Sequence, residues 1–476
     1  MKKYIYSSAF GHSNKKYNSI IIDTDGAADD LRTICLLLSS DKIQVNAITT
    51  SDGALIPDEG LVKVRALLRS FGHEGIPTSS GEITQPNPPQ WRELSQKISW
   101  GDEHQIETNI EENAPDLIIS SIYAEEEETT IVCLGSLTNI ANALRVKPEI
   151  KERIKRIVWH NNSIHPIFGT NYEIDKKAAE YILKIEIQLD IVNNIEGKEI
   201  GFTEKLLRDI ETIKTPYAQK IAESHRPSKV YERIQTNHFK IWDELVALYL
   251  LYPELFETKI FEKYPNHSIN SIFQTAKIED KIVEVLSCKN NENYIVFKNF
   301  PNDYNLYNDD VNKYMHQIIE NYGKEEWGII VLTNEFHTHL GIYSIIGAKM
   351  GLRAREYFNV GLDELYVVSY AGSRPPISCL NDGLQVSTGA TLGHGTIITM
   401  TEDLLQHPKA IFTYNNITMS LELKHEYWGI VRKDIKQGIK LHGALTDDYW
   451  SFVRELAIKY WLEWSRKEIF NIEKIE

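Results

Sequence analysis

The chain has 476 residues, of which 42% are hydrophobic and 25% are charged, as is typical of globular proteins. This length exceeds one ordinary hydrophobic core and predicts two or three domains. The formal net charge of −15 argues against nucleic acid or an anionic membrane surface as the main partner, because phosphate binding needs a basic face. We therefore expect a small-molecule ligand or a protein partner.

The sequence shows little sign of export or of disulfide bonding. Residues 1–19 lack the apolar segment of a signal peptide, and no stretch approaches eighteen uninterrupted apolar residues. The cysteines Cys35, Cys133, Cys288 and Cys379 share no close spacing, so they imply neither a disulfide scaffold nor a zinc ribbon. The sequence predicts a soluble, cytoplasmic protein.

The first part of the chain alternates short apolar runs with longer segments of helical periodicity. The expected strands are 19–23, 43–50, 129–135 and 156–160, and the expected helices are 29–40, 58–72, 137–146, 175–184 and 242–256. This alternation predicts an α/β domain with a mostly parallel sheet and flanking helices. The ligand site of such a sheet lies at the carboxyl ends of its strands.

The pattern changes after Glu257. We expect strands over 281–288 and 293–300 and a helix over 311–323. A new strand followed by a histidine-bearing loop then marks a domain boundary, which gives domains 1–324 and 325–476. The second domain is expected to be a smaller α+β domain, with strands in 364–372, 395–400, 409–415 and 420–424 and a final helix over 449–470.

Four aspartates follow the first predicted strand within the sequence IIIDTDGAADD. Asp23, Asp25, Asp29 and Asp30 would repel one another in one crevice unless a cation or ligand hydroxyls lay between them. Gly26 permits a tight turn on which carboxylates can converge, as a calcium ion requires. The alternative is that they cap the following helix, which would explain one or two of the four.

The segment DTDGAADD resembles the DTDPGxDD signature of the inosine-uridine nucleoside hydrolase family, with all four aspartates matched and the proline missing. Three further segments follow in the family's order. LGSLTNIANAL, 134–144, is similar to LGPLTNIA; NYEIDKKAAEYIL, 171–183, resembles N-x-x-x-D-P-x-A-A; and 242–256 resembles HDPLAVAYLLDPELF. The resemblance implies the family's fold as far as the helix ending near Tyr322.

This resemblance also implies a calcium-dependent hydrolase that cleaves the N-glycosidic bond of a ribonucleoside or related ribosyl compound. It places Asp25, Asp30, Asp243 and the backbone carbonyl of Thr138 around a calcium ion. It places Asp29 and Asn171 on the 2′ and 3′ hydroxyls of the ribose. Asp25 would take the proton of a water held by the cation, which then attacks the anomeric carbon.

Several positions depart from the family pattern. The family has histidine at Trp242, asparagine at Ala54, glutamate at Gly169, and a glycine pair within WHNN, 159–162. In one explanation the aglycone is unusual, with Trp242 stacking on it and one of the histidines His160, His165 and His238 donating a proton. In the other, catalysis has lapsed and the domain only binds a ribosyl ligand. The retained calcium ligands favour the first.

The second domain carries its own group of metal-type ligands. His337 and His339 stand two residues apart, and Cys379, Asp382 and His394 follow in a segment rich in glycine and threonine. From the residues alone, a metal site and a glycine-rich ligand-binding turn are equally open.

Residues 327–423 resemble the FmdE family of formylmethanofuran dehydrogenase proteins through NEFHTHLG and CLNDGLQVSTGATLGHGTI. Thr338 replaces a glycine of the first motif. The resemblance implies a metal, expected to be zinc, on His339 and Cys379, with His337 and His394 as neighbours. We expect the last fifty residues to form a packing or dimerisation helix, in a homodimer or homotetramer. A structural component of a larger redox enzyme is a third possible role.

Overall fold

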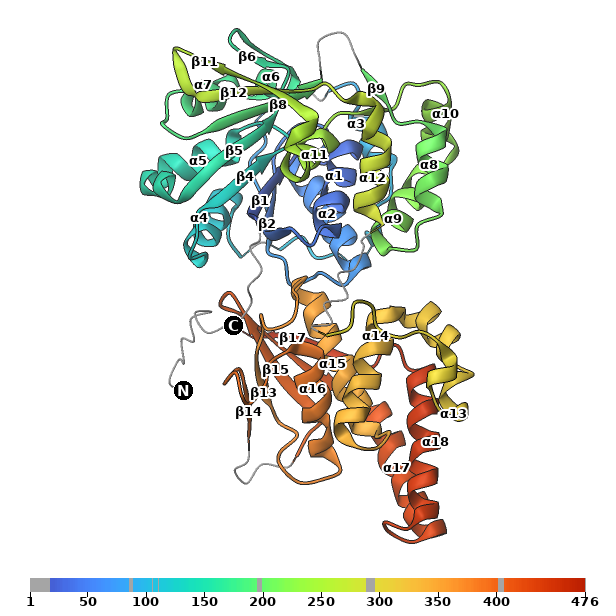
Figure 1. Cartoon of the computed structure of the whole chain (residues 1–476). Helices are drawn as coiled ribbons and strands as arrows, with labels where there is room; N and C mark the ends of the chain where they lie inside the picture. Colours follow the sequence, from blue (N-terminus) through green and yellow to red (C-terminus); the bar gives the residue numbers. More distant parts are fainter. Residues whose placement is uncertain are drawn as a thin grey trace. The chain divides into compact units, whose positions relative to one another are not determined.

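The computed structural model describes residues 18–84, 89–104, 106–109, 111–194, 199–287, 296–400 and 406–475 (Figure 1). The chain divides into two compact units, one of Lys16–Asn290 and one that contains Asn291–Glu476, here called the N-terminal and C-terminal units. Cys288 and residues 293–295 of a predicted strand lie outside the described residues. Residues 296–300, the described part of that strand, are not in a strand.

An eight-stranded sheet forms the centre of the N-terminal unit, in the order β11-β12-β8-β5-β4-β1-β2-β3. Neighbouring strands are parallel except for β11 and β12, which confirms the predicted mostly parallel α/β fold. The strands are β1 (Asn18–Thr24), β2 (Ile43–Thr50), β3 (Thr78–Ser80), β4 (Thr129–Cys133), β5 (Ile154–His160), β8 (Leu189–Asn194), β11 (Phe256–Phe261) and β12 (Tyr264–Ile272).

Helices cover both faces of this sheet, because successive side chains of a strand point to opposite faces. In β1, Ile20 and Ile22 pack in one apolar core, and Ile21 packs in the other. The first core includes residues of α1 (Ala28–Ser39), α2 (Pro57–Phe71), α8 (Glu204–Glu211), α9 (Pro216–His225), α11 (Glu244–Leu251) and α12 (Ile278–Leu286). The second includes residues of α4 (Ala114–Ala124), α5 (Thr138–Val146) and α7 (Lys176–Ile182).

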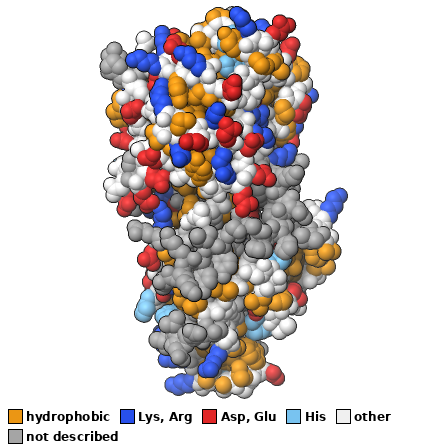
Figure 2. Space-filling view, turned by 90° about the vertical axis from the view of Figure 1, so that its left-hand side faces the viewer, with side chains coloured by type: hydrophobic (Ala, Val, Ile, Leu, Met, Phe, Trp, Pro, Cys, Tyr) orange, Lys and Arg blue, Asp and Glu red, His pale blue; other side chains and the backbone are white. Residues whose placement is uncertain are grey.

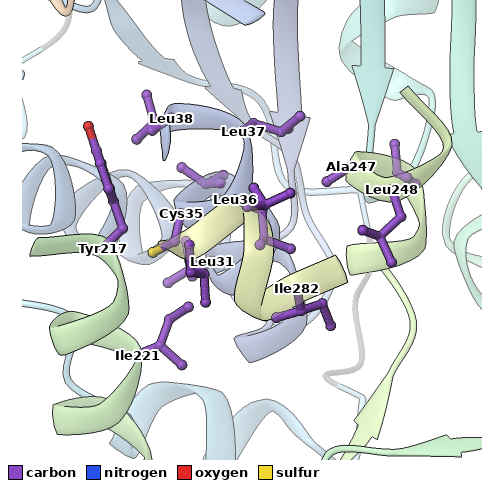
Figure 3. Packing of buried hydrophobic residues seen from close by; sticks show 14 of the residues in the cluster. Leu31, Cys35, Leu36, Leu37, Leu38, Tyr217, Ile221, Ala247, Leu248 and Ile282 are labelled. Atoms are coloured by element: carbon purple, nitrogen blue, oxygen red, sulfur yellow. The ribbon is translucent and has the colours of Figure 1, made fainter. Parts of the chain in front are cut away.

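Helix α1 is buried on almost every side. Figure 3 shows Leu31 and Leu36 of α1 among Ile221 of α9, Leu248 of α11 and Ile282 of α12. A helix that is apolar all round belongs in a core, and its position is then fixed by packing rather than by its own propensity. The residues at its amino end are therefore held by a rigid element.

The C-terminal unit joins helices to a five-stranded sheet with the order β14-β13-β15-β16-β17. Only β13 and β14 pair in parallel. The strands are β13 (Tyr366–Ser369), β14 (Ile397–Thr399), β15 (Lys409–Tyr414), β16 (Ile417–Leu423) and β17 (Phe470–Ile475). The main helices are α14 (Met315–His337), α15 (Ile342–Phe358), α16 (Leu380–Thr388), α17 (His425–His442) and α18 (Asp447–Glu463).

Some predicted elements were wrong. The predicted strand 281–288 is largely helix α12, whose buried residues Ile278, Ile282 and Val285 follow a helical period. The strand predicted at the start of the second domain is part of α14, although its run of β-branched residues favours a strand. The glycine- and threonine-rich segment contains helix α16, and the last fifty residues form two helices and a strand rather than one helix.

The division between the units falls at 290/291, earlier than the predicted boundary at 324/325. Val311, Met315 and Ile318 are buried in the core of the C-terminal unit, so the helical segment before Gly323 packs with the second unit. At Gly323 the backbone has φ 91° and ψ 160°, and the two helical stretches of α14 meet there.

The surface carries both signs of charge. Figure 2 shows Lys and Arg side chains interspersed with Asp and Glu over the face of the N-terminal unit turned to the viewer. Among the described residues, none of the helices combines the length and apolar character needed to cross a bilayer.

Candidate active site

The first group of aspartates lies where β1 ends and α1 begins. Gly26 has φ 78°, a left-handed conformation that favours glycine, and it turns the chain from the strand into the helix. Asp29 and Asp30 then fall in the first turn of α1, where the helix dipole favours negative charge. The Asp30 carboxylate accepts hydrogen bonds from the Thr24 hydroxyl at 2.6 Å and from the backbone N–H of Asp25 at 3.0 Å.

Asp243 joins these residues from the start of α11. Asp29, Asp30 and Asp243 each offer a carboxylate oxygen, and the three oxygens lie within 4.8 Å of one another. Among the described residues, Oδ1 of Asp30 and Oδ1 of Asp243 are buried without a hydrogen bond, although Nδ1 of His160 lies 2.8 Å from the Asp243 oxygen. Carboxylate oxygens without hydrogen bonds in a dry site are costly, and a divalent cation would satisfy them. The donor set therefore fits a hard metal ion.

Electrostatics supports the same conclusion. Burial, together with smaller contributions from the nearby charges of Asp29 and Asp23, raises the pKa of Asp25 to about 7. Burial, followed by repulsion from neighbouring aspartates, also raises the pKa of Asp30 and of Asp243 well above the usual value. Without a cation the ionised cluster is unfavourable, so the site is built for positive charge.

Asp23 has a different role from the other three aspartates. Its carboxylate accepts hydrogen bonds from the Thr49 hydroxyl at 2.6 Å and from the Asn139 amide at 2.7 Å. Asp23 thereby ties β1 to β2 and to α5, and burial raises its pKa to about 6. Asp23 thus stabilises the end of β1, from which the chain continues to the other three aspartates.

Asp25 lies against the loop that follows β2. Its Oδ1 accepts from the backbone N–H of Ala27 at 3.2 Å, and a Cβ added to Gly53 would lie 2.2 Å from its Oδ2. Asp52 fixes this loop, because its carboxylate is 2.8 Å from Nη2 of Arg92, which also donates to the Gly53 carbonyl. The backbone of the loop therefore closes over Asp25.

Asn171 and Thr138 lie on the neighbouring segments. The Asn171 side-chain amide donates to the backbone carbonyls of Leu134 at 2.7 Å and His160 at 2.9 Å, which leaves its oxygen to meet a ligand. Thr138 begins α5, and its hydroxyl donates to Asp175 at 2.9 Å. Its backbone carbonyl stays a predicted metal ligand.

The structure separates the three candidate histidines. His160, at the end of β5, has Nδ1 2.8 Å from Oδ1 of Asp243, without the alignment of a hydrogen bond. His165 instead stacks on Tyr264 with ring centroids 4.2 Å apart and bonds His267. His238 is exposed. Only His160 among these three contacts the carboxylate cluster, and burial lowers its pKa.

Two further contacts were not anticipated from the sequence. Asp175 both caps α7, by accepting from the Ala178 N–H, and holds the Thr138 hydroxyl. Arg32 and Glu244 form a buried ion pair beside the aspartates. For the ion pair, the sequence did contain a signal: one charged residue stands within each of two otherwise apolar helices, LRTICLLLS and ELVALYLL.

The C-terminal unit brings part of its predicted ligand group together. His337 ends α14, and its Nδ1 lies 2.6 Å from Oδ2 of Asp382 in the first turn of α16. Cys379 precedes α16 directly, and all three residues line a cavity of about 350 Å³. His339 packs beside His337, with ring centroids 4.2 Å apart. The hydrogen bond to Asp382 raises the pKa of His337 to about 9.

His394 does not join this group. Its Nδ1 lies 3.2 Å from the carbonyl of Gly389 and 3.3 Å from Asp363, beyond the carboxyl end of α16, whereas Cys379 precedes the amino end. Thr338 has φ 68°, which explains why the related motif carries glycine at this position. The conformation of the turn is kept although the residue differs.

Comparison with known proteins identifies the N-terminal unit. The family profile of the inosine-uridine preferring nucleoside hydrolases matches residues 20–311. The chain belongs to this nucleoside hydrolase family. A second profile, described as FmdE, molybdenum formylmethanofuran dehydrogenase operon, matches residues 336–471. The nucleoside hydrolase is thus joined to an FmdE segment in a single chain.

Several nucleoside hydrolases match about half of this chain. An inosine-uridine preferring nucleoside hydrolase of Leishmania major is 27% identical over 260 residues, covering 50% of this chain and 81% of that protein. A pyrimidine-specific ribonucleoside hydrolase of Shewanella woodyi is 27% identical over 258 residues, covering 50% and 80%. The solved purine-preferring ribonucleoside hydrolase from Gardnerella vaginalis is 19% identical, covers 56% of this chain and 98% of its own, and has a TM-score of 0.47.

Three departures of this nucleoside hydrolase from the family pattern can be located in the structure. Gly169 has φ 147°, and a Cβ there would lie 2.0 Å from Oδ1 of Asn161, so the loop has no room for the family's glutamate. Ala54 is fully buried in the loop over Asp25. Trp242 precedes Asp243 and keeps 39% of its surface exposed, so its ring is available to a ligand.

Proposed function

We propose that the N-terminal unit hydrolyses the N-glycosidic bond of a ribonucleoside or related ribosyl compound with calcium as its metal. The observation that carries this proposal is the convergence of carboxylate oxygens of Asp29, Asp30 and Asp243, with Oδ1 of Asp30 buried and without a hydrogen-bond partner among the described residues. An all-oxygen donor set favours calcium over softer metals.

Asp25, Asp30, Asp243 and the carbonyl of Thr138 would hold the ion. When bound, calcium supplies positive charge that makes a nearby water more acidic and attracts the hydroxyls of the sugar. Asp25 then accepts the proton of the attacking water, and its position under the Gly53 backbone keeps its carboxylate in place. Orientation by a rigid site of this kind removes much of the entropic barrier to attack.

The ribose is bound by Asp29 and Asn171 in this proposal. Asp29 is half-buried at the start of α1, where its carboxylate can accept hydrogen bonds from a sugar hydroxyl. The oxygen of Asn171 is oriented by its two amide hydrogen bonds. A vicinal diol therefore meets acceptors on both sides.

Trp242 and His160 act on the aglycone. The exposed ring of Trp242 offers a stacking surface for a heterocycle, next to the metal ligand Asp243. His160 reaches the same carboxylate from β5, and its imidazole N–H can donate to a leaving nitrogen while neutral. In this proposal, Trp242 and His160 take the place of the residues with which the family contacts the leaving group.

The test is release of reducing sugar from a panel of purine, pyrimidine and modified ribonucleosides. We expect turnover of at least one substrate, its loss on treatment with EDTA, and its recovery on addition of calcium. Asp25→Ala should abolish turnover. Tight binding of nucleosides without turnover anywhere in the panel would contradict hydrolysis and favour a ribosyl-binding protein.

For the C-terminal unit we propose a zinc site on His337, His339 and Cys379. The supporting observation is that Asp382 holds Nδ1 of His337 while Cys379 lines the same cavity beside this imidazole. A histidine oriented by a carboxylate in this way is typical of metal sites. Zinc analysis of the purified full chain, with Cys379→Ser as the comparison, tests this assignment.

A further inference from the structure

A buried ion pair joins the two helices that begin at the carboxylate cluster. Arg32 lies on α1, two residues after Asp30, and Glu244 is the first residue of α11, directly after Asp243. Nε of Arg32 donates to Oε1 of Glu244, and the two side chains are only 2% and 1% exposed. The pair thus links the two helices whose amino ends carry the two parts of the proposed metal site.

Arg32 is held on several sides. Its Nη2 donates to the backbone carbonyl of Lys240 at 2.7 Å, and Nη1 lies 3.1 Å from Nε2 of His225. The guanidinium carbon lies 4.7 Å and 4.8 Å from the ring centroids of Phe202 and Phe239. A planar guanidinium with these partners has a single orientation.

Glu244 extends the arrangement to the segment that carries Asp243. Its second oxygen accepts from the backbone N–H of Trp242 at 3.1 Å. The Lys240 carbonyl and the Glu244 side chain are therefore both tied to Arg32, and Trp242 and Asp243 lie between these two anchor points. One guanidinium thus ties this segment to α1, in addition to the apolar packing between α1 and α11.

Such a connection is needed because the carboxylates at the two helix starts repel one another. A pair of apolar side chains could pack between α1 and α11 without the desolvation cost of buried charge. Apolar packing has no directionality, however, and cannot hold a particular carbonyl and a particular N–H. The ionic pair adds this directionality.

We propose that Arg32 and Glu244 are positioning residues that hold Asp243 and Trp242 in register with Asp29 and Asp30, and so preorganise the site for its metal. This inference rests on the calcium site of the proposed function and deepens it. Neither residue contacts substrate; each acts through the segment it holds.

The test uses the full chain carrying Arg32→Met and Glu244→Met together, which removes both charges and keeps similar volume. Calorimetric titration with calcium should show affinity weakened about 10–100-fold, as when outer partners of metal ligands are removed. The melting temperature in EDTA should stay within a few degrees of wild type, because the replaced pair remains packed. Terbium luminescence sensitised through Trp242 should fall at a given terbium concentration.

Lys63→Met is the matched control, since Lys63 is a buried cation of α2 that donates to the Ile98 carbonyl and bonds Glu103 away from the aspartates. It should lower the melting temperature and leave calcium affinity unchanged. Should the double variant fail to fold, Arg32→Lys carries the test, because a single ammonium cannot keep all these contacts.

Wild-type calcium affinity in the folded double variant, or in Arg32→Lys, would overturn the positioning role alone. Absence of calcium binding by the wild-type chain would overturn the calcium site and the positioning role with it. The two failures are therefore separated within one set of titrations.

Discussion

The two candidate metal sites of this chain are built in opposite ways. In the N-terminal unit three carboxylates converge, and burial and mutual repulsion raise the pKa values of Asp30 and Asp243. In the C-terminal unit His337 has an internal counter-charge, because Asp382 is bonded to its Nδ1. The negative charge of the first site is balanced only when a cation binds. In the second site the charges of His337 and Asp382 already balance each other. Metal removal should therefore affect the two units very differently.

The largest effect is expected from Asp30→Asn. This change removes a proposed calcium ligand. The amide oxygen of the new asparagine can still accept the hydrogen bonds that Thr24 and Asp25 donate. We expect calcium binding to be lost and nucleoside hydrolysis to fall by about 1000-fold or more, because the metal contributes several kcal/mol to catalysis. Steady-state kinetics in excess calcium provide the measurement. Asp209→Asn, on the exposed face of helix α8, is the control, and equal losses in both variants would contradict the assignment.

The next effect is a pH-dependent loss of stability in the metal-free chain. The folded protein keeps a proton on Asp25 up to about pH 7, whereas the unfolded chain releases it near pH 4. Unfolding therefore releases protons between these values, and stability falls as pH rises through this window. The melting transition that calcium shifts should drop by about 5–10 °C between pH 5 and pH 8 in EDTA.

Calcium should remove most of this trend, because the ion stabilises the ionised carboxylates. A metal-free melting temperature that rises over the same pH range would show that the carboxylates are paired in another way. The transition of the C-terminal unit should not share the trend.

A smaller effect is expected at the second site from Asp382→Asn. The amide can keep one hydrogen bond to His337 but loses the negative charge that orients and polarises the ring. Zinc affinity should fall about 10–100-fold, measured by competition with a chromophoric chelator. Calcium affinity of the same variant is the internal control and should not change. Unaltered zinc affinity would exclude Asp382 as the orienting partner.

The smallest effect is expected from Trp242→Ala. Loss of ring stacking should raise KM for nucleosides with heterocyclic bases about 2–10-fold and leave kcat nearly unchanged, since aromatic contacts contribute about 0.5–1.5 kcal/mol. A substrate with a small, non-aromatic aglycone should be insensitive. Equal changes for both kinds of substrate would show that Trp242 acts through Asp243 instead.

The sequence was sufficient for the parts of the site that depend on local structure. The strand, glycine turn and helix expected around Asp25, Asp29 and Asp30 are present in the structure, because these elements follow one another within a few residues. The parallel sheet followed from the alternation of elements. In α14, by contrast, Ile329 and Ile330 favour a strand by propensity, and packing in the C-terminal core imposes a helix.

Contacts between distant segments could not be predicted. Three histidines were equal candidates until the end of β5 was seen to meet the start of α11, which singles out His160. Arg32 and Glu244 lie 212 positions apart and share no motif. Such pairs depend on the register of packed helices, and no local pattern of one sequence encodes that register.

The bonding of Asn171 bears on the design of inhibitors. Both hydrogens of its amide are already given to backbone carbonyls, so in its proposed role at the ribose it can act only as an acceptor. A ribose analogue in which fluorine or a methyl ether replaces the matching hydroxyl has no hydrogen to offer. Such analogues should compete poorly with the parent compound, whereas analogues that retain both hydroxyls should compete well.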